Sequence, residues 1–238
     1  MPSLAAIALM INGLLVGIVI GYVAARWRVP GAADVGEAPA GSAGGGADRG
    51  RVWQTVRSGF GVSPLVFMAA GAGVSAWTVM AAPLALWGLS ALLGWLLLVL
   101  AAIDFRLFIL PNRLVAVLAG LGALMVAFDR PEVWLDHAIG GALGYGILFA
   151  VEVGYKAVRG RDGLGRGDAK LLGAIGVWTG WEGLPSVMLA ASVAGLGAAL
   201  AMAAVRRTPL SGSVAIAFGP WIALGGWIVW LHGPLRLV

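Results

Sequence analysis

The chain has 238 residues, of which 60% are hydrophobic and only 11% are charged, and its formal net charge is +5. A soluble domain carries about 25% charged residues, so this composition excludes an ordinary soluble protein and predicts a chain that crosses a membrane several times. The sequence contains no cysteine, which excludes a disulfide framework, a thiolate zinc site and a cysteine nucleophile. The basic residues are scattered among apolar runs, which argues against a nucleic-acid partner.

Eight apolar runs follow one another along the chain. A transmembrane helix needs about 20 apolar residues, so the sequence predicts an all-α, polytopic membrane bundle of about eight helices. We expect the first run to be a retained span, because it is too long for a signal-peptide core and no basic stretch precedes it. The runs are residues 4–25, 64–82, 84–103, 114–128, 135–154, 169–182, 184–205 and 214–232.

Two of these segments need comment. Residues 29–50 are rich in Gly, Ala and Pro, which predicts a flexible cytoplasmic linker. We therefore divide the chain into residues 1–63, the first span with its linker, and residues 64–238, a membrane domain. The sixth run is short for a span and could be a re-entrant half-helix. We favour a short or tilted crossing, because re-entry would place Arg206 and Arg207 outside.

The charges give the orientation. If the N-terminus faces outward, the inner loops hold all but Arg130 and Arg236 of the 16 Lys and Arg residues. The positive-inside rule describes this bias in short loops. On this topology Asp104, at the end of the third run, and Asp168, just before the sixth, lie at the same cytoplasmic depth.

Carboxyl groups at the edge of the hydrocarbon are costly, and they are functional-site candidates by default. Two carboxylates a few ångströms apart cannot both ionise cheaply. One therefore keeps its proton while the other accepts a proton from water, as aspartic proteolysis requires without a metal. Each acid also has a structural alternative: Asp104 could pair with Arg106 or Arg113, and Asp168 could cap a helix N-terminus.

Three segments resemble motifs of the type IV prepilin peptidases, a family of intramembrane aspartic proteases. Residues 102–114 read AIDFRLFILPNRL, residues 163–172 read GLGRGDAKLL and residues 217–223 read AFGPWIA, in the order and spacing of that family. The resemblance implies that Asp104 and Asp168 are the catalytic pair. It implies supporting roles for Gly165, Gly167, Lys170, Pro111, Phe218, Gly219 and Pro220.

The resemblance also implies a reaction and a place. The enzyme would lie in the bacterial inner membrane with its active site at the cytoplasmic side, and would remove the basic leader peptide from type IV prepilins or from pseudopilins of type II secretion. Prepilin substrates and membrane lipids would be its partners. Bifunctional relatives also methylate the new N-terminus with S-adenosylmethionine, and they carry a larger insert with cysteines after the first span. The insert here is short and cysteine-free, so we expect cleavage without efficient methylation, and a role for that cofactor only if methylation occurs.

Two other functions stay open: a different G-x-G-D protease, of the presenilin or signal-peptide-peptidase kind, and a non-enzymatic proton-coupled membrane protein. The remaining polar residues are given structural roles. The Lys170 ammonium is expected to snorkel to lipid headgroups, and Glu152 to pair with Lys156 one helical turn away near the interface. His137 and His232 are far apart in the sequence, which argues against a metal site.

Two patterns concern packing. Small residues four apart, such as Gly140 with Gly144 and Gly195 with Ala199, predict close helix contacts. Tryptophans near the ends of the runs predict an aromatic belt at the membrane interfaces. Those named for the belt are Trp27, Trp134, Trp178, Trp181 and Trp230.

Overall fold

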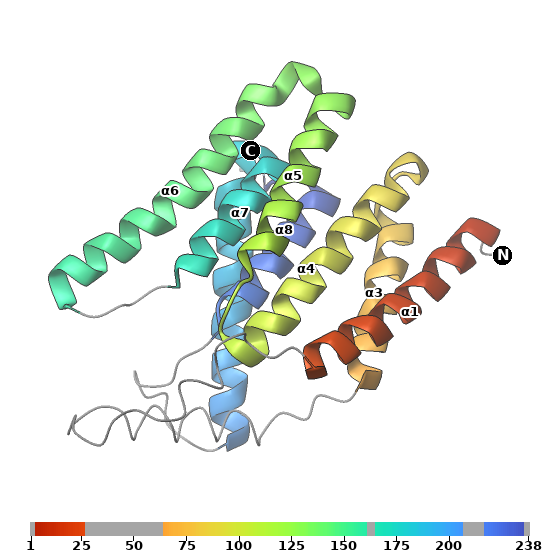
Figure 1. Cartoon of the computed structure of the whole chain (residues 1–238), viewed down its shortest axis with the longest axis horizontal. Helices are drawn as coiled ribbons and strands as arrows, with labels where there is room; N and C mark the ends of the chain where they lie inside the picture. The colour runs from red at the N-terminus through yellow and green to blue at the C-terminus, as the bar shows by residue number, and fades with distance from the viewer. Residues whose placement is uncertain (1–2, 27–63, 161–164, 207–216, 236–238) are drawn as a thin grey trace.

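The structure, a computed structural model, describes residues 3–26, 64–160, 165–206 and 217–235. These residues form helices and short connections and contain no strand, so the all-α class is confirmed. Figure 1 shows successive helices running up and down, as expected for a chain that crosses a membrane repeatedly. The linker predicted at residues 29–50 lies outside the described residues.

The helices follow the apolar runs in order. They are α1 (Leu4–Arg26), α3 (Pro64–Ala81), α4 (Trp87–Leu107), α5 (Asn112–Asp129), α6 (Trp134–Arg159), α7 (Arg166–Arg206) and α8 (Gly219–His232), with the short 3₁₀ helices η2 (Leu84–Leu86) before α4 and η3 (Pro131–Val133) before α6.

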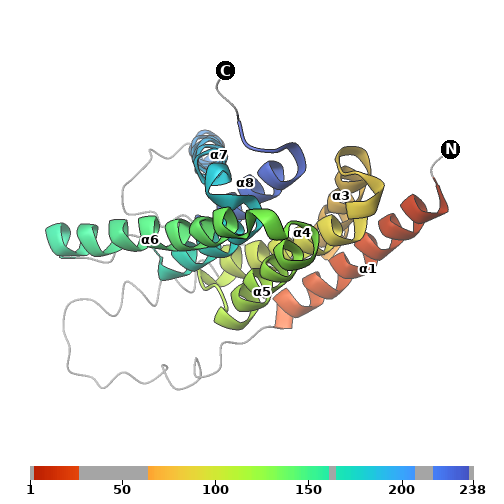
Figure 2. The same ribbon diagram turned by 90° about the horizontal axis from the view of Figure 1, so that it is seen from above.

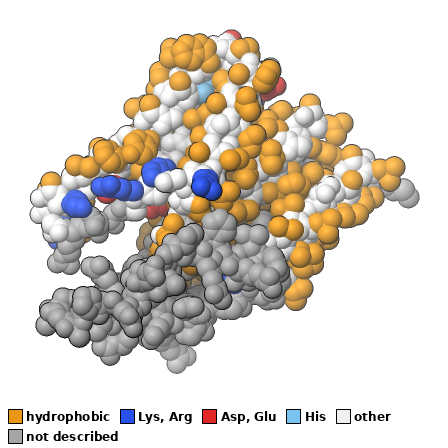
Figure 3. All heavy atoms as spheres, viewed as in Figure 1, with side chains coloured by type: hydrophobic (Ala, Val, Ile, Leu, Met, Phe, Trp, Pro, Cys, Tyr) orange, Lys and Arg blue, Asp and Glu red, His pale blue; other side chains and the backbone are white. Residues whose placement is uncertain are grey.

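Length and hydropathy confirm a polytopic membrane protein. Four of the described stretches are long and apolar enough to cross a bilayer: Leu84–Leu107, Asn112–Asp129, Pro131–Arg159 and Arg166–Val205. Leu4–Val19 and Leu65–Ala81 are shorter apolar helices. Hydrophobic side chains cover much of the face shown in Figure 3, as contact with lipid requires.

The helix α7 consists of two segments joined at Gly180. Its backbone there has φ 71° and ψ 174°, a conformation that glycine adopts without the steric penalty of a Cβ atom. The chain reverses at this point, and the two segments run in opposite directions (Figure 1). They correspond to the sixth and seventh apolar runs. With α7 divided in this way, the described residues form eight α-helical segments, one for each predicted apolar run.

Two cavities at opposite ends of the bundle show how far the sixth run extends. One, of about 230 Å³, is lined by Ser90 near the start of α4 and by Thr179 at the end of the first segment of α7. The other, of about 330 Å³, is lined by Asp104 near the end of α4 and by Asp168 at the start of α7. The first segment of α7 therefore reaches the same two ends of the bundle as α4, which favours a short crossing over a re-entrant loop.

The core lies between α4, α5, α7 and α8. Leu100, Leu118, Ile175 and Ile222, one from each helix, are at most 1% exposed and belong to one hydrophobic cluster. On the side of α4 away from α6, α1 packs against α3. Burial of apolar surface against neighbouring helices thus holds together the part of the bundle that carries Asp104 and Asp168.

Glycines allow the closest helix contacts. Of all the described helix pairs, α6 and α7 form the most extensive contact. A Cβ atom on Gly144 would lie 2.6 Å from the Leu172 carbonyl oxygen, and one on Gly195 would lie 3.2 Å from Cδ1 of Trp221. The predicted close packing at these small residues is confirmed.

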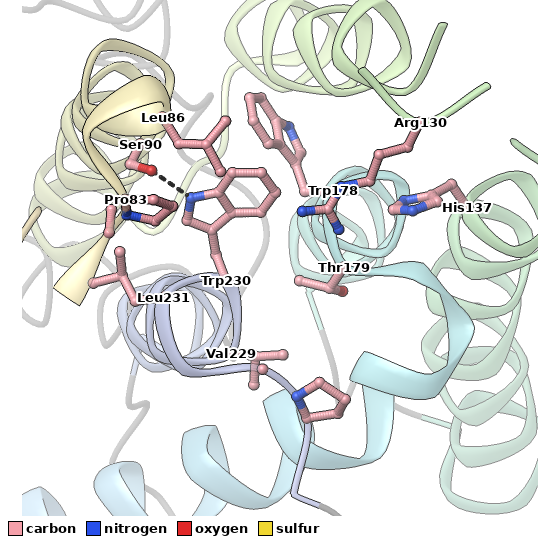
Figure 4. Close-up of a pocket in the computed structure, with 13 residues that line it drawn as sticks. Pro83, Leu86, Ser90, Arg130, His137, Trp178, Thr179, Val229, Trp230 and Leu231 are labelled. Atoms are coloured by element: carbon pink, nitrogen blue, oxygen red, sulfur yellow. Dashed lines mark hydrogen bonds between the residues drawn. The ribbon is translucent and has the colours of Figure 1, made fainter. Parts of the chain in front are cut away.

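The aromatic belt is wrong for Trp178. Trp134 and Trp181 are 60% and 44% exposed, as a belt requires, but Trp178 is 1% exposed. Its Nε1 donates to the Leu118 carbonyl oxygen at 2.8 Å, and its ring meets that of Trp230 edge-on with the centroids 5.2 Å apart (Figure 4). Trp178 lies near a helix end, but on the face of α7 that packs into the core.

Candidate active site

Asp104 lies in the last turn of α4 and is 5% exposed. The helix ends because Phe108 takes the left-handed conformation, with φ 53° and ψ 33°. The Phe108 N–H donates to the Asp104 carbonyl oxygen at 2.8 Å. This conformation costs a bulky residue about 1 kcal/mol, and it turns the chain toward Pro111, which directly precedes α5. The first motif is therefore a helix end followed by a sharp turn.

Asp168 lies in the first turn of α7 and is 8% exposed. Its backbone N–H donates to the Gly165 carbonyl oxygen at 3.0 Å. A Cβ atom on Gly167 would lie 3.1 Å from Cβ of Leu110, so the missing side chain lets the second motif approach the first. Asp168 is the third residue of α7, and its Oδ2 lies 3.2 Å from where a Cβ atom of Gly165 would be.

The third motif brings backbone against the Asp104 carboxyl. The helix α8 begins at Gly219 with Pro220 in its first turn, where the fixed φ of proline suits a helix start. A Cβ atom on Gly219 would lie only 2.6 Å from Oδ2 of Asp104. That oxygen is buried and has no hydrogen-bond partner among the described residues. Only glycine leaves room for the carboxyl here, and the partial positive charge of a helix N-terminus makes a favourable neighbour for it.

All three motifs line the cavity of about 330 Å³. A water molecule occupies about 30 Å³ in the liquid, so the cavity has room for several waters or for a short stretch of peptide. Pro111, Gly219 and Pro220 shape the helix starts beside it. The lining residues are Asp104, Phe108, Ile109, Leu110, Asn112, Gly165, Arg166, Gly167, Asp168, Lys170, Ala217 and Phe218.

The prediction for Lys170 is wrong. Its ammonium lines the cavity and donates to Oδ1 of Asn112 at 2.8 Å, instead of reaching toward lipid headgroups. Lys170 follows Asp168 on α7, whereas Asn112 begins α5 directly after the first motif. The hydrogen bond therefore joins the two motifs that carry the acids.

The predicted setting of Glu152 is also wrong. Glu152 is only 4% exposed, and its Oε1 accepts a hydrogen bond from Nε of Arg166 at 2.9 Å. It continues the buried stripe of α6, which consists of His137, Gly140, Gly144, Leu148 and Glu152. The spacing of these positions, three residues and then four at each later step, is a signal that could have placed Glu152 inside the bundle.

The two histidines have separate structural neighbours. Nδ1 of His137 lies 2.8 Å from the Val177 carbonyl oxygen, and Nε1 of Trp77 donates to Nε2 of His232 at 3.2 Å. Within the part of the chain that the structure describes, no group of three or more His, Cys, Asp or Glu side chains could hold a metal ion. His137 lines the cavity at the other end of the bundle, away from the two aspartates.

Comparison with known proteins places the site in a family. Residues 91–200 match the type IV leader peptidase family, and this segment contains both aspartates. The chain is 40% identical over 139 residues to the prepilin leader peptidase/N-methyltransferase of Escherichia coli K12, a match covering 56% of this chain and 60% of that protein. It is 42% identical over 142 residues to the enzyme of the same name from Dickeya chrysanthemi, covering 57% of this chain and 49% of that protein.

A third relative, from Pectobacterium carotovorum, is 37% identical over 166 residues, or 69% of this chain and 56% of that protein. The chain thus spans about half the length of the curated relatives it matches. No solved structure matches the chain. The resemblance seen in the motifs is confirmed: the segment of this chain that carries Asp104 and Asp168 matches the type IV leader peptidase family.

Proposed function

We propose that this protein is an aspartic endopeptidase that cleaves the basic leader peptide from type IV prepilins or pilin-like proteins, with Asp104 and Asp168 as its catalytic pair. One observation carries the proposal: the two acids, far apart in the sequence, are both buried and line one cavity. The names of the relatives, prepilin leader peptidase/N-methyltransferase, support the same reaction.

The chemistry follows from two carboxyl groups that share a confined site. One is ionised and accepts a proton from a water molecule as that water attacks the scissile carbonyl carbon, while the other donates its proton to the carbonyl oxygen. The C–N bond then breaks, and a proton passes to the leaving amine. Repulsion between two nearby carboxylates keeps one proton on the pair, so each acid has a partner of the opposite protonation state.

The substrate class fits the place of the site. The leader of a prepilin is basic and the segment after it is an apolar helix, so the bond to be cut lies near the membrane surface. The cavity lies at one end of the bundle, where α4 ends and α5, α7 and α8 begin. We propose that this end faces the cytoplasm and that the protein lies in the inner membrane beside its prepilin substrates and lipids.

Charge supports this orientation. The last turn of α6 holds Lys156 and Arg159, Figure 3 shows Lys and Arg side chains on this side of the molecule, and basic residues favour the cytoplasmic side in short loops. Reporters fused after Arg113 and Arg161 are expected to report the cytoplasm, and a reporter at the C-terminus the outside. A reporter after Arg113 that read outside would contradict the proposed orientation.

The proteolytic step is tested with the purified full chain, a prepilin and mass spectrometry of the products. The wild-type protein is expected to release the leader. Asp104→Asn and Asp168→Asn should each lower the rate by about 1,000-fold or more, because members of a cooperating catalytic unit cannot replace one another. The exposed acid Asp129 at the other end of the bundle provides the control, and Asp129→Asn should cleave normally. Retained cleavage in either aspartate variant of the site would refute the assignment.

Methylation is read from the same products. We propose that the protein cleaves without efficient N-methylation, since the segment at residues 29–50 is short and the chain contains no cysteine. That segment lies outside the described residues. With S-adenosylmethionine present, the mature N-terminus is expected to keep its unmodified mass. A product heavier by one methyl group, formed in step with cleavage, would contradict this and show that the protein is bifunctional, as the names of its relatives state.

A further inference from the structure

Glu152 is buried where its neighbours are not. From Phe149 to Arg159 every residue of α6 is exposed except Glu152, and this part of the helix extends away from the rest of the bundle in both Figures 1 and 2. The residues before it in the buried stripe are small or apolar, apart from His137. Burying a carboxylate at the next position of this stripe costs more free energy than burying a small or apolar side chain there, because burial removes the hydration of the charge.

The partner of Glu152 lies at the start of the helix that carries Asp168. Oε1 of Glu152 accepts from Nε of Arg166 at 2.9 Å, and the two side chains are 5% and 67% exposed. Arg166 is the first residue of α7 and lines the cavity of the two acids. A hydrogen bond between two charged groups is shorter and stronger than one between neutral groups, so it fixes where α7 begins relative to α6.

The pair is not optimised for stability. Oε2 of Glu152 is buried without a hydrogen-bond partner among the described residues, and a buried ion pair is often no more stable than an apolar replacement. Gly165 and Gly167 flank Arg166 on either side, and glycine leaves the backbone more conformational freedom than any other residue. The ion pair of Arg166 with Glu152 of α6 restricts the backbone at the start of α7, which these two glycines leave free to move.

We propose that the Glu152–Arg166 pair is a positioning element that ties the first turn of α7 to α6 and so holds the Asp168 carboxyl in the cavity opposite Asp104. The expected effect on kcat rests on the proposed proteolytic function. The ion pair between Glu152 and Arg166 is a property of the fold and does not depend on that function. Both residues act through Asp168 and are not assigned contact with the scissile bond.

The kinetic test uses Glu152→Gln, which keeps the size of the side chain and removes its charge. Because a small displacement of a catalytic group lowers the rate of the chemical step, kcat is expected to fall about tenfold while KM stays within about twofold. Arg166→Gln should behave in the same way. The double variant should be no slower than either single one, because both substitutions remove the same interaction. Asp129→Asn, which breaks the exposed pair of Asp129 with Arg130, is the matched control and should leave kcat and KM unchanged.

A second measurement does not depend on substrate. Amide hydrogen exchange, read by mass spectrometry on the purified full chain, should be faster in the first turn of α7 in Glu152→Gln, because local opening sets the exchange rate. The amides of α8 serve as the internal reference and should exchange as in the wild type.

The two measurements separate the possible failures. If the wild-type protein does not cleave prepilin but exchange at the start of α7 rises in Glu152→Gln, the proteolytic function is wrong and the tie is supported. If the wild type cleaves and Glu152→Gln keeps both its kcat and its exchange rates, the positioning role is overturned. A rise in KM with unchanged kcat would also overturn it, because that result assigns the pair to substrate binding.

Discussion

At its two ends the bundle uses the same helices in different ways. At the end shown in Figure 4, two large rings line a cavity of about 230 Å³ and their polar atoms have partners: Nε1 of Trp178 donates to the Leu118 carbonyl oxygen, and Nε1 of Trp230 donates to Oγ of Ser90 at 2.9 Å. At the other end the backbone of Gly167 and Gly219 lies close to Leu110 and Asp104, and Oδ2 of Asp104 is buried without a hydrogen-bond partner among the described residues. Buried polar groups are nearly always paired in native structures, so the unpaired carboxyl oxygen agrees with the catalytic role proposed for Asp104.

The strongest test of this comparison removes the Trp178 ring, which lies at the end shown in Figure 4. Trp178→Ala is expected to lower the free energy of unfolding by about 3–5 kcal/mol, because a large buried side chain leaves a cavity. The fraction that remains folded should cleave prepilin at close to the normal rate. Thermal unfolding followed by activity per folded molecule measures both effects. A fully folded Trp178→Ala variant with no activity would show that the two ends are not separate.

The second test fills the space at the acid end. Gly219→Ala places a Cβ atom 2.6 Å from Oδ2 of Asp104, so the carboxyl must move, and activity should fall by about 100-fold. Gly88→Ala is the matched control, because it lies near the other end of the helix that carries Asp104 and a Cβ atom there meets nothing within 4 Å. It should keep full activity and unfold at an equal or slightly higher temperature, since alanine favours a helix over glycine by about 1 kcal/mol. Equal activities for the two variants would contradict the tight fit around Asp104.

The smallest effect is expected at the hydrogen bond that joins the two motifs. Lys170→Met and Asn112→Ala each remove the contact between Nζ and Oδ1, which as an exposed bond to a charged group is worth about 1 kcal/mol, or about fivefold in rate. Loss of the same bond makes the two effects non-additive, so the double variant should match the slower single one. Additive losses in the cleavage assay would show that Lys170 and Asn112 act independently.

Much of the fold is readable from the sequence because apolar length is a local property. Each described helix coincides with one predicted run or, for α7, with two that are separated at Gly180. The motifs also located the acids, since the local sequence around Asp104 and Asp168 carries the resemblance that comparison with the family confirmed. The division of the chain at residue 63 stays a prediction.

Where regularly spaced small residues do not mark a packing face, the tertiary structure alone decided which face of a helix points inward. Trp178 and Lys170 were misplaced for this reason: in a chain this apolar, the side of a helix that meets lipid and the side that meets another helix are both hydrophobic. Glu152 was misplaced because the spacing of the buried stripe of α6 was not extended to it. In a soluble helix a polar face would have marked the outside. The membrane class, the number of helices and the places of the two aspartates in the chain could therefore be predicted from the sequence alone. The tie of Glu152 to Arg166, the hydrogen bond of Lys170 to Asn112 and the fit of Gly219 against Asp104 were decided by packing, because each joins residues that are distant in the chain and meet only when the helices assemble.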